Sequence, residues 1–267
     1  MSTQSSLDER NARFWDMLCG WSMARAIGIT GDEREDLARF DEAYLDYYPY
    51  LAGYLDDSYA GRSVLEVGLG FGTLGQLLVE RGADYHGVDI ASEPVSLMQR
   101  RLHMLGAGDP ERIVQASVLA LPFPDEHFDG VVSIGCLHHT GDLRRAIAEV
   151  RRVLKPGGRA IVMLYYAHSV RQLVQPFRAL VSRDWRRAFA ERVRGLYDND
   201  REGASAPHTD YVSRREAQRL FAEFSRVRIE TRNFPEYMVR GRTIKRVWFL
   251  DNAARIIGLD VYVVAVK

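Results

Sequence analysis

A glycine-rich segment is the clearest candidate for chemistry in this sequence of 267 residues. It reads Glu66-Val-Gly-Leu-Gly-Phe-Gly-Thr-Leu-Gly75 and follows a short apolar run. Glycines at such a turn let the backbone pass close to a ligand, and the amides at the start of the following helix face that ligand. The spacing of Gly70, Gly72 and Gly75 also satisfies a dinucleotide-binding pattern, with Asp89 where a ribose-binding acid is expected. The ligand at this turn is therefore either a dinucleotide or another adenosine-containing molecule, and both interpretations place an adenosine here.

Glu66 and Gly68 distinguish between these two interpretations. A carboxylate beside the turn would repel a pyrophosphate. The same carboxylate accepts hydrogen bonds from an ammonium group, directly or through water. An amino-acid moiety attached to the adenosine carries such a group. These two residues therefore favour an adenosine that bears an amino acid over a nicotinamide dinucleotide.

Two adjacent histidines, His138 and His139, form the second candidate. They come shortly after the apolar run 131–134, and ligands of open parallel sheets bind beyond the carboxyl ends of the strands. A histidine with a pKa near neutrality removes the proton from an attacking hydroxyl or amine, which is worth typically about 10²–10⁴-fold in rate. The alternative is that both side chains hydrogen-bond the backbone and shape the pocket ahead of a helix capped by Thr140 or Asp142.

The elements that would position these residues alternate between strands and helices from residue 63 onward. Apolar, β-branched runs predict strands, and segments with a period of 3.6 residues predict helices. The predicted strands are 64–67, a run ending at 89, 113–114, 131–134 and 160–166, and the predicted helices are 74–80, 94–105 and 142–154. Lys155-Pro-Gly-Gly158 ends the third helix. Five strands that alternate with helices predict an α/β fold with a doubly wound, mostly parallel sheet.

The segments outside this alternation predict a helical cap. Residues 1–60 are rich in Trp and Tyr and are expected to form helices ahead of the core, which spans 61–166. An insertion at 167–210 follows, and 211–267 completes the core with a helix at 213–224, strands at 227–230 and 261–264, and a second insertion, irregular to helical, at 233–258. We expect these segments to close over the site and exclude water from it. Candidates for its aromatic lining are Trp15, Tyr47, Tyr48, Tyr237 and Trp248.

Five motifs in a fixed order resemble those of the class I S-adenosylmethionine (SAM)-dependent methyltransferases of the small-molecule type. They are Val64-Leu-Glu-Val-Gly-Leu-Gly-Phe-Gly72, Gly87-Val-Asp-Ile90, Leu121-Pro-Phe-Pro-Asp-Glu-His-Phe-Asp129, Cys136-Leu-His-His-Thr140 and Val153-Leu-Lys-Pro-Gly-Gly158. The resemblance covers roughly residues 61–166. It implies a Rossmann-like, seven-stranded sheet whose last strand, 261–266, is antiparallel, and it implies SAM as the cofactor.

The resemblance assigns roles to the residues that match the family motifs. Glu66, Gly68 and Gly70 match the positions that hold the methionine part of SAM. Asp89 matches the acid that accepts from the ribose hydroxyls, and Ile90 matches the residue against the adenine.

The adenine position departs from the family pattern. In many members an acid after the third strand accepts from the adenine amino group, but Ser117 stands there in this sequence. A serine oxygen accepts without charge, so adenine selectivity would depend on the backbone of Val118 and Leu119. Gly135 and Cys136 match positions that contact the methionine portion.

The resemblance also bears on the substrate side. In related carboxyl- and hydroxyl-directed enzymes the second histidine of the pair tends to face the substrate, which favours His139 over His138 as the base. Tyr166 and His168 leave the fifth strand at its carboxyl end, where we expect them to face the substrate, with simple packing as the alternative.

Composition limits the partners of this chain. The 36 Lys and Arg balance 36 Asp and Glu, which disfavours a nucleic-acid partner. The two cysteines, Cys19 and Cys136, are too few for a disulfide framework and have no partners at metal-ligand spacing, so we expect a reducing compartment and no metal. The N-terminal residues do not resemble a signal peptide, and the longest apolar run, 160–167, is far shorter than the roughly 20 residues of a membrane helix. We therefore expect a cytoplasmic protein without a membrane partner.

Arginine is concentrated in the cap region. Residues 167–246 contain 17 Arg and Lys245 against 10 Asp and Glu, a net charge of +8. Such a cap would favour an anionic substrate, because arginine pairs bidentately with carboxylate and phosphate groups. The alternative is that most of these arginines form a solvated helical face.

We therefore predict a SAM-dependent methyltransferase that acts on an O, N or C nucleophile of a small-molecule substrate. An RNA methyltransferase is one alternative, although Cys136-Leu-His-His139 stands where such enzymes carry Asn/Asp-Pro-Pro-Tyr. A SAM-binding protein that does not transfer methyl, or that uses the fold for cyclisation, is the other, because binding and catalytic residues are separable. The sequence leaves the oligomeric state open.

Overall fold

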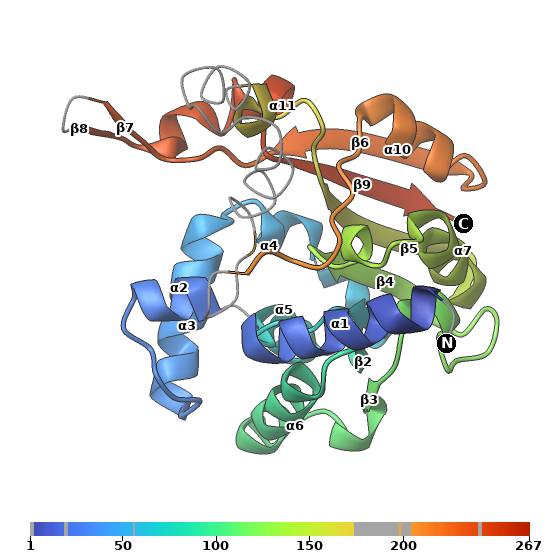
Figure 1. Cartoon of the computed structure of the whole chain (residues 1–267). Helices are drawn as coiled ribbons and strands as arrows, with labels where there is room; N and C mark the ends of the chain where they lie inside the picture. The colour runs from blue at the N-terminus through green and yellow to red at the C-terminus, as the bar shows by residue number, and fades with distance from the viewer. Residues whose placement is uncertain (1–2, 19–20, 56, 174–197, 199–203, 240–241) are drawn as a thin grey trace.

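The computed structural model describes the chain except for residues 1–2, 19–20, 56, 174–197, 199–203 and 240–241. Its centre is a seven-stranded sheet in the order β3-β2-β1-β4-β5-β9-β6 (Figure 1). The strands are β1 (Ser63–Val67), β2 (Asp84–Asp89), β3 (Ile113–Gln115), β4 (Phe128–Ile134), β5 (Leu154–Tyr165), β6 (Arg226–Arg232) and β9 (Asp260–Val266). β9 is antiparallel to both β5 and β6, whereas β1 is parallel to β2 and β4. The predicted doubly wound sheet with an antiparallel last strand is confirmed.

The strand order reverses at β1. The chain runs from β1 outward to β2 and β3, then returns so that β4 pairs with the other edge of β1. Ligands of open α/β sheets bind at such a reversal, beyond the carboxyl ends of the strands. The glycine-rich turn follows β1 and the histidine pair follows β4, so the sheet brings the two candidate segments side by side.

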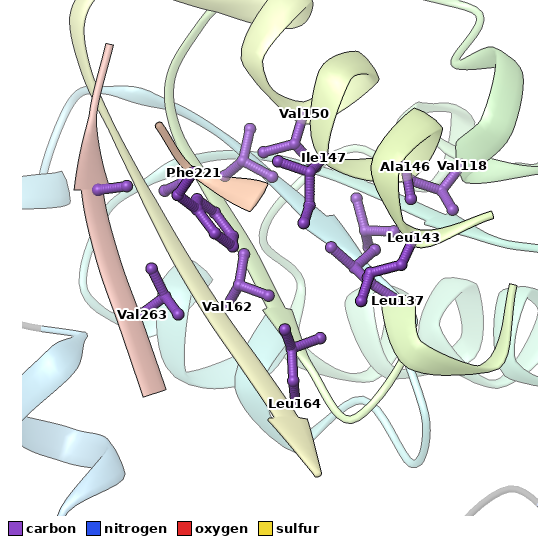
Figure 2. Close-up of a cluster of buried hydrophobic side chains, with 14 of the residues drawn as sticks. Val118, Leu137, Leu143, Ala146, Ile147, Val150, Val162, Leu164, Phe221 and Val263 are labelled. Carbon is purple, nitrogen blue, oxygen red and sulfur yellow. The ribbon is translucent and has the colours of Figure 1, made fainter. Parts of the chain in front are cut away.

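Apolar side chains cover both faces of the sheet. Val162 and Leu164 of β5 lie in the cluster under α7 (Leu143–Val153) that Figure 2 shows. Ile161 and Met163 of the same strand lie in the cluster on the opposite face. Burial on both faces is typical of central parallel strands and accounts for the near-continuous apolar run of β5.

Helices flank the sheet close to where the sequence predicts them. In the core they are α5 (Thr73–Glu80), α6 (Ser92–Leu105), α7 and α10 (Arg214–Leu220), and before it come α1 (Thr3–Leu18), α2 (Trp21–Ala26), α3 (Arg34–Tyr47) and α4 (Leu51–Tyr54). The start of α7 is fixed by Asp142, whose side chain accepts from the backbone nitrogen of Arg145 at 3.0 Å. α1 packs beside α6 and α3 beside α5, so the N-terminal helices (blue in Figure 1) lie against the core.

Two predicted elements differ from the structure. β5 begins at Leu154 and includes the Lys-Pro-Gly-Gly sequence, so it is longer than the predicted run 160–166. The second insertion, predicted as irregular to helical, contains the hairpin of β7 (Tyr237–Val239) and β8 (Arg242–Ile244), followed by η5 (Arg246–Phe249) and α11 (Ala254–Ile257). The hairpin strands are three residues each, too short for a period of two to be recognised in the sequence.

Candidate functional site

A cavity of about 830 Å³ lies at the carboxyl ends of β1, β2 and β4. This volume lies in the upper part of the range of about 300–1,000 Å³ that is typical of ligand pockets. All but one of the cofactor residues predicted from the sequence line it, together with His139: Glu66, Gly68, Gly70, Asp89, Ile90, Ser117, Val118, Gly135 and Cys136. Leu119 is the exception, because its side chain packs into the core under α7.

Two glycines of the glycine-rich turn stand at positions where a larger residue does not fit. Gly68 has a φ of +84°, and a Cβ there would overlap the Cβ of Cys136. Gly72 has a φ of +80°, and a Cβ there would lie 2.7 Å from Cδ of Arg101. Both positions combine a left-handed backbone with close packing against a neighbouring side chain, Cys136 or Arg101. Only glycine fits such positions without strain.

Glu66 is a buried carboxyl group in the wall of this cavity. The Tyr85 hydroxyl donates to its Oε2 at 2.5 Å. Burial raises the pKa of Glu66 to about 8, against the lowering effect of that hydrogen bond. A cationic group bound beside it would restore the ionised form, because an opposite charge within a few ångströms favours ionisation. The site is therefore suited to the ammonium group that the sequence predicts.

Asp89 holds the turn and the start of the next helix together. Its Oδ2 accepts from the backbone nitrogen of Leu69 at 2.8 Å, and its Oδ1 accepts from that of Ala91 at 2.9 Å. Burial raises the pKa of Asp89 to about 6, although these backbone donors lower it. Each carboxylate oxygen has a further lone pair, so Asp89 can still accept from ribose hydroxyls at the cavity wall.

A residue that sequence reasoning missed stands beside Ser117. Asp8 of α1 lines the cavity, and the Ser117 hydroxyl donates to its Oδ2 at 3.5 Å. The Asp8 carboxylate is also fixed from α1 itself, where Gln4 Nε2 donates to its Oδ1 at 2.7 Å. The N-terminal helix thus supplies a carboxylate next to the position where the core strand carries a serine. No local pattern links two residues 109 positions apart.

His139 lines the cavity with a defined tautomer. Its Nδ1 lies 2.8 Å from the carbonyl oxygen of His208. Because a carbonyl oxygen only accepts, Nδ1 carries the proton and Nε2 has the free lone pair in the neutral ring. Burial lowers the pKa of His139, which keeps the ring neutral near pH 7. Nε2 has no hydrogen-bond partner among the residues that the structure describes.

Asp198 is the acidic neighbour of this histidine. Its Oδ2 lies 3.6 Å from Nε2 of His139 and accepts from the Tyr165 hydroxyl at 2.9 Å. Burial raises the pKa of Asp198, while His139 and Tyr165 lower it. The group of His139, Asp198 and Tyr165 therefore joins the fourth strand end, the first insertion and the fifth strand at one wall of the cavity. Sequence reasoning missed Asp198 because nothing in its local sequence distinguishes it from other cap residues.

His138 occupies a different environment from His139. Its side chain is fully buried and is not part of the cavity lining. Its ring centroid lies 4.1 Å from those of both His139 and Tyr165. Burial holds the pKa of His138 well below its usual value. The structure thus gives His138 a packing position behind the residue that faces the cavity.

The substrate-side residues of the fifth strand differ from the expectation. Tyr166 is buried in the core under α7, and the His168 side chain is exposed. Tyr165 and Met163 line the cavity instead. Neighbouring residues of a strand point to opposite faces, so the cavity face of β5 carries the odd-numbered side chains.

The cap contributes aromatic side chains to the cavity. Trp15, Tyr47 and Tyr48 line it as expected, and the Trp15 ring centroid lies 4.7 Å from that of His139. Trp248 is exposed, and the side chain of Tyr237 lies outside the described residues. Most of the first insertion, 167–210, also lies outside the described residues.

At the end of the cavity nearest the cap, carboxyl groups outnumber cations among the described lining residues. Asp198, Asp260 and Glu236 line it, and Arg171 is the arginine of the 167–246 region that does so among the described residues. Burial raises the pKa of Asp260 to about 7. In the described part of the chain, no three His, Cys, Asp or Glu side chains gather as a metal site would require.

Sequence comparisons match the central part of this chain to methyltransferases. Residues 65–162 match a family model described as a methyltransferase domain. The chain is 36% identical over 106 residues to demethylmenaquinone methyltransferase of Thermus thermophilus, covering 39% of this chain and 47% of that protein. It is 38% identical over 117 residues to the ubiquinone biosynthesis O-methyltransferase of Pseudomonas entomophila, covering 42% and 49%. The fatty-acid O-methyltransferase of Mycolicibacterium smegmatis is 33% identical over 141 residues, covering 52% and 48%.

The matched region spans about half the length of these curated relatives. Among solved structures, the YcgJ protein from Bacillus subtilis has a TM-score of 0.54 at 20% identity, covering 83% of this chain and 98% of that one. A SAM-dependent methyltransferase from Archaeoglobus fulgidus has a TM-score of 0.52 at 16% identity, covering 86% and 94%. These structural likenesses show the fold. The matched family model and the ordered motifs identify residues 65–162, within this Rossmann-like core, as a class I SAM-dependent methyltransferase domain.

Proposed function

We propose that this protein transfers the methyl group of SAM to a nucleophile of a small molecule, with His139 as the base. One observation carries the proposal: a single cavity is lined by the glycine-rich turn, by Asp89 and by His139. Cofactor and acceptor would meet in that cavity, and holding two reactants in the correct geometry supplies much of the rate enhancement of a group transfer.

Residues of the core would hold the cofactor at one end of the cavity. Glu66 would bind the ammonium group, and Asp89 would accept from the ribose hydroxyls. Asp8 and Ser117 would accept from the adenine amino group, since they lie at the wall beyond Asp89. When bound, SAM supplies an electrophilic methyl group on its sulfonium sulfur. The raised pKa of Glu66 supports this orientation, because an ammonium group would relieve the cost of ionising that buried carboxyl.

His139 would remove the proton of the acceptor at Nε2. The His208 carbonyl keeps Nδ1 protonated, so the lone pair of the neutral ring lies on Nε2. As the ring becomes positively charged, Asp198 at 3.6 Å would stabilise it. The Tyr165 hydroxyl holds Asp198 in place, which limits how far its carboxylate can turn away. This arrangement suits an acceptor with a hydroxyl or amine proton to lose.

The cap end of the cavity suits an acceptor with a largely apolar body. Trp15, Tyr44, Tyr47 and Tyr48 line it. Curated relatives are named for demethylmenaquinone, ubiquinone biosynthesis and fatty acids, which supports an apolar acceptor with one ionisable oxygen. Carboxyl groups outnumber arginine in the described lining, which disfavours a highly charged anion. The expectation of an anionic substrate is therefore narrowed to an acceptor with a single acidic group.

Isotopically labelled SAM and fractionated metabolite extracts test the proposal. We expect the label to appear in an extracted small molecule, with one S-adenosylhomocysteine formed per methyl transferred. His139→Gln is the informative variant, because it should retain cofactor binding and lose transfer. Binding of SAM with no labelled product from any fraction would favour a SAM-binding protein without methyl transfer. Labelling of an RNA fraction would favour the RNA methyltransferase alternative.

A further inference from the structure

Exposed large hydrophobic side chains are concentrated in one segment of this protein. Among the described residues, the solvent-exposed large hydrophobic side chains are Val247, Trp248, Ile256 and Leu173, with 54%, 68%, 69% and 48% of their surface exposed. The first three come from ten consecutive residues that run from η5 into α11. We call Val247, Trp248 and Ile256 the Trp248 patch. Scattered apolar residues need no explanation, but such a local concentration marks an interaction surface.

The outer side of this segment carries Val247, Trp248 and Ile256 among exposed polar and charged residues, and the inner side is apolar. Successive tight turns connect η5 to α11, with backbone bonds from Leu250 to Val247 and from Asn252 to Phe249. On the inner side, the ring of Phe249 stacks on Phe234 with centroids 4.7 Å apart. The inner side chains therefore already pack this segment against the rest of the protein. The outer apolar side chains are more than half exposed, so they are available for an intermolecular contact.

The patch lies beside the cap end of the cavity. Arg246, directly before it, is buried, donates from Nε to the Phe234 carbonyl at 3.0 Å, and bonds the Tyr47 carbonyl and the Asn233 side chain. Its guanidinium also lies 3.8 Å from the centre of the Tyr47 ring. Tyr47 and Asn233 both line the cavity. Leu173 follows another lining residue, Arg171, by two positions. The exposed hydrophobics thus adjoin residues of the cavity wall.

Two exposed cations, Lys245 and Arg255, flank the patch among the described residues, with Asp251 as the exposed acid between them. Lys245 is exposed at the start of the segment. Arg255 is exposed as well, 3.6 Å from Asp251. The β7–β8 hairpin, which carries Arg242, projects from the body of the molecule in Figure 1.

We propose that the Trp248 patch docks the protein onto an anionic membrane surface. Tryptophan is favoured at the membrane–water interface, and apolar residues flanked by Lys and Arg bind anionic lipid by burial and by electrostatic attraction together. The contact is peripheral: among the described residues, no helix has the length and apolar character needed to cross a membrane. The sequence offered no such span, which is why no membrane partner was expected. The exposed patch became visible only in the fold.

Vesicle co-sedimentation tests this proposal with the chain of 267 residues. We expect binding to vesicles of phosphatidylcholine with about one third phosphatidylglycerol, and at least tenfold weaker binding to phosphatidylcholine alone or at high salt. Trp248→Ala and Lys245→Glu should each weaken binding to the anionic vesicles at least tenfold. Arg228→Glu, an equal charge change on exposed β6, is the matched control and should bind like the unmodified protein. The assay contains neither SAM nor acceptor, so its result is independent of the proposed methyl transfer.

Two further measurements make the proposal falsifiable. Brominated lipids should quench tryptophan fluorescence of the bound protein, and Trp248→Phe should remove most of the quenching while retaining binding. Absence of vesicle binding, or unchanged binding by Trp248→Ala, would overturn the proposal. A second copy of the chain is the other possible occupant of the patch, and light scattering tests for it. If the protein is a dimer, if Trp248→Ala converts it to a monomer and if vesicles are not bound, the patch is a dimer interface.

Discussion

The carboxylate of Asp8, in the first helix, lies 3.5 Å from the hydroxyl of Ser117, which follows the third strand. The two residues are 109 positions apart. Ser117 stands where related sequences carry an acid that accepts from adenine. The structure places a carboxylate at that wall of the cavity from the N-terminal helix, so we propose that part of the cap also belongs to the cofactor site.

Asp8→Asn should therefore weaken SAM binding about tenfold, because a hydrogen bond to a charged group contributes roughly 1.5–3 kcal/mol and Asp8 is only partly buried. Isothermal titration calorimetry with SAM and S-adenosylhomocysteine measures the change. Glu9→Gln, an exposed position on the same helix, is the matched control. Adding Ser117→Asp to Asp8→Asn should restore affinity, since it returns the carboxylate to the strand end. Unchanged affinity in Asp8→Asn would remove Asp8 from the cofactor site.

Asp89→Ala should weaken SAM binding by roughly 1.5–3 kcal/mol, the scale of hydrogen bonds to a charged group. The reason is twofold, because Asp89 would accept from the ribose and also bonds the backbone of Leu69 and Ala91. Asp84→Ala, at the exposed start of the same strand, should leave the dissociation constant unchanged. Calorimetry with NAD serves as a specificity control, and NAD binding tighter than SAM binding would contradict the assignment of this site.

His139→Gln should lower turnover by about 10²–10⁴-fold, the usual contribution of a general base, with little change in SAM affinity. Burial lowers the pKa of His139 below its ordinary value, so activity of the unmodified protein should rise with pH through a pKa below about 6.5 and then level off. His103→Gln is the control, since His103 also places Nδ1 near a backbone carbonyl but lies exposed on α6. Equal turnover in His139→Gln, or a profile without this rise, would make the histidine structural.

Asp198→Asn tests whether Asp198, in the first insertion, contributes to catalysis by stabilising protonated His139. The variant should lower kcat about tenfold or more, because the imidazolium that forms loses a charge at 3.6 Å. Removing that charge should also lower the pKa of the pH–rate profile, since an opposite charge favours the protonated ring. Steady-state kinetics across pH measures both effects. A lower kcat with an unshifted profile would indicate that Asp198 only packs the wall.

The stability of the ligand-free protein should fall as pH rises from about 4.5 to about 8, through the contribution of Glu66. Its pKa is about 8 in the folded chain and about 4.5 when exposed, so over this window the folded state binds more protons than the unfolded state. Glu66→Gln should therefore be more stable than the unmodified protein near pH 8, with the difference shrinking toward pH 4.5. Thermal unfolding across this pH range measures the difference, and saturating SAM should reduce it. An equal difference at both ends of the range would contradict the raised pKa.

Local sequence determined the core of this protein. The alternation of strand and helix patterns between residues 63 and 166 predicted the sheet, because each pattern depends on side chains only a few positions apart. The glycine-rich turn and Asp89 are predicted to lie at a cofactor because the turn follows β1 and Asp89 ends β2, both at the carboxyl ends of the strands. His139 was preferred over His138 from the family motif, and the structure places it in the cavity wall.

Tertiary structure decided which side chains face the cavity and which distant residues join them. β5 is apolar on both faces, so no period of two could show that Tyr165 rather than Tyr166 points inward. Asp8 and Asp198 reach the cavity from helices and loops that no pattern connects to the strands they meet. Exposure of Trp248 likewise depends on which side of its segment packs against Phe234 and Tyr47. Contacts between elements far apart in the chain are set by packing, and packing leaves no local signal in the sequence.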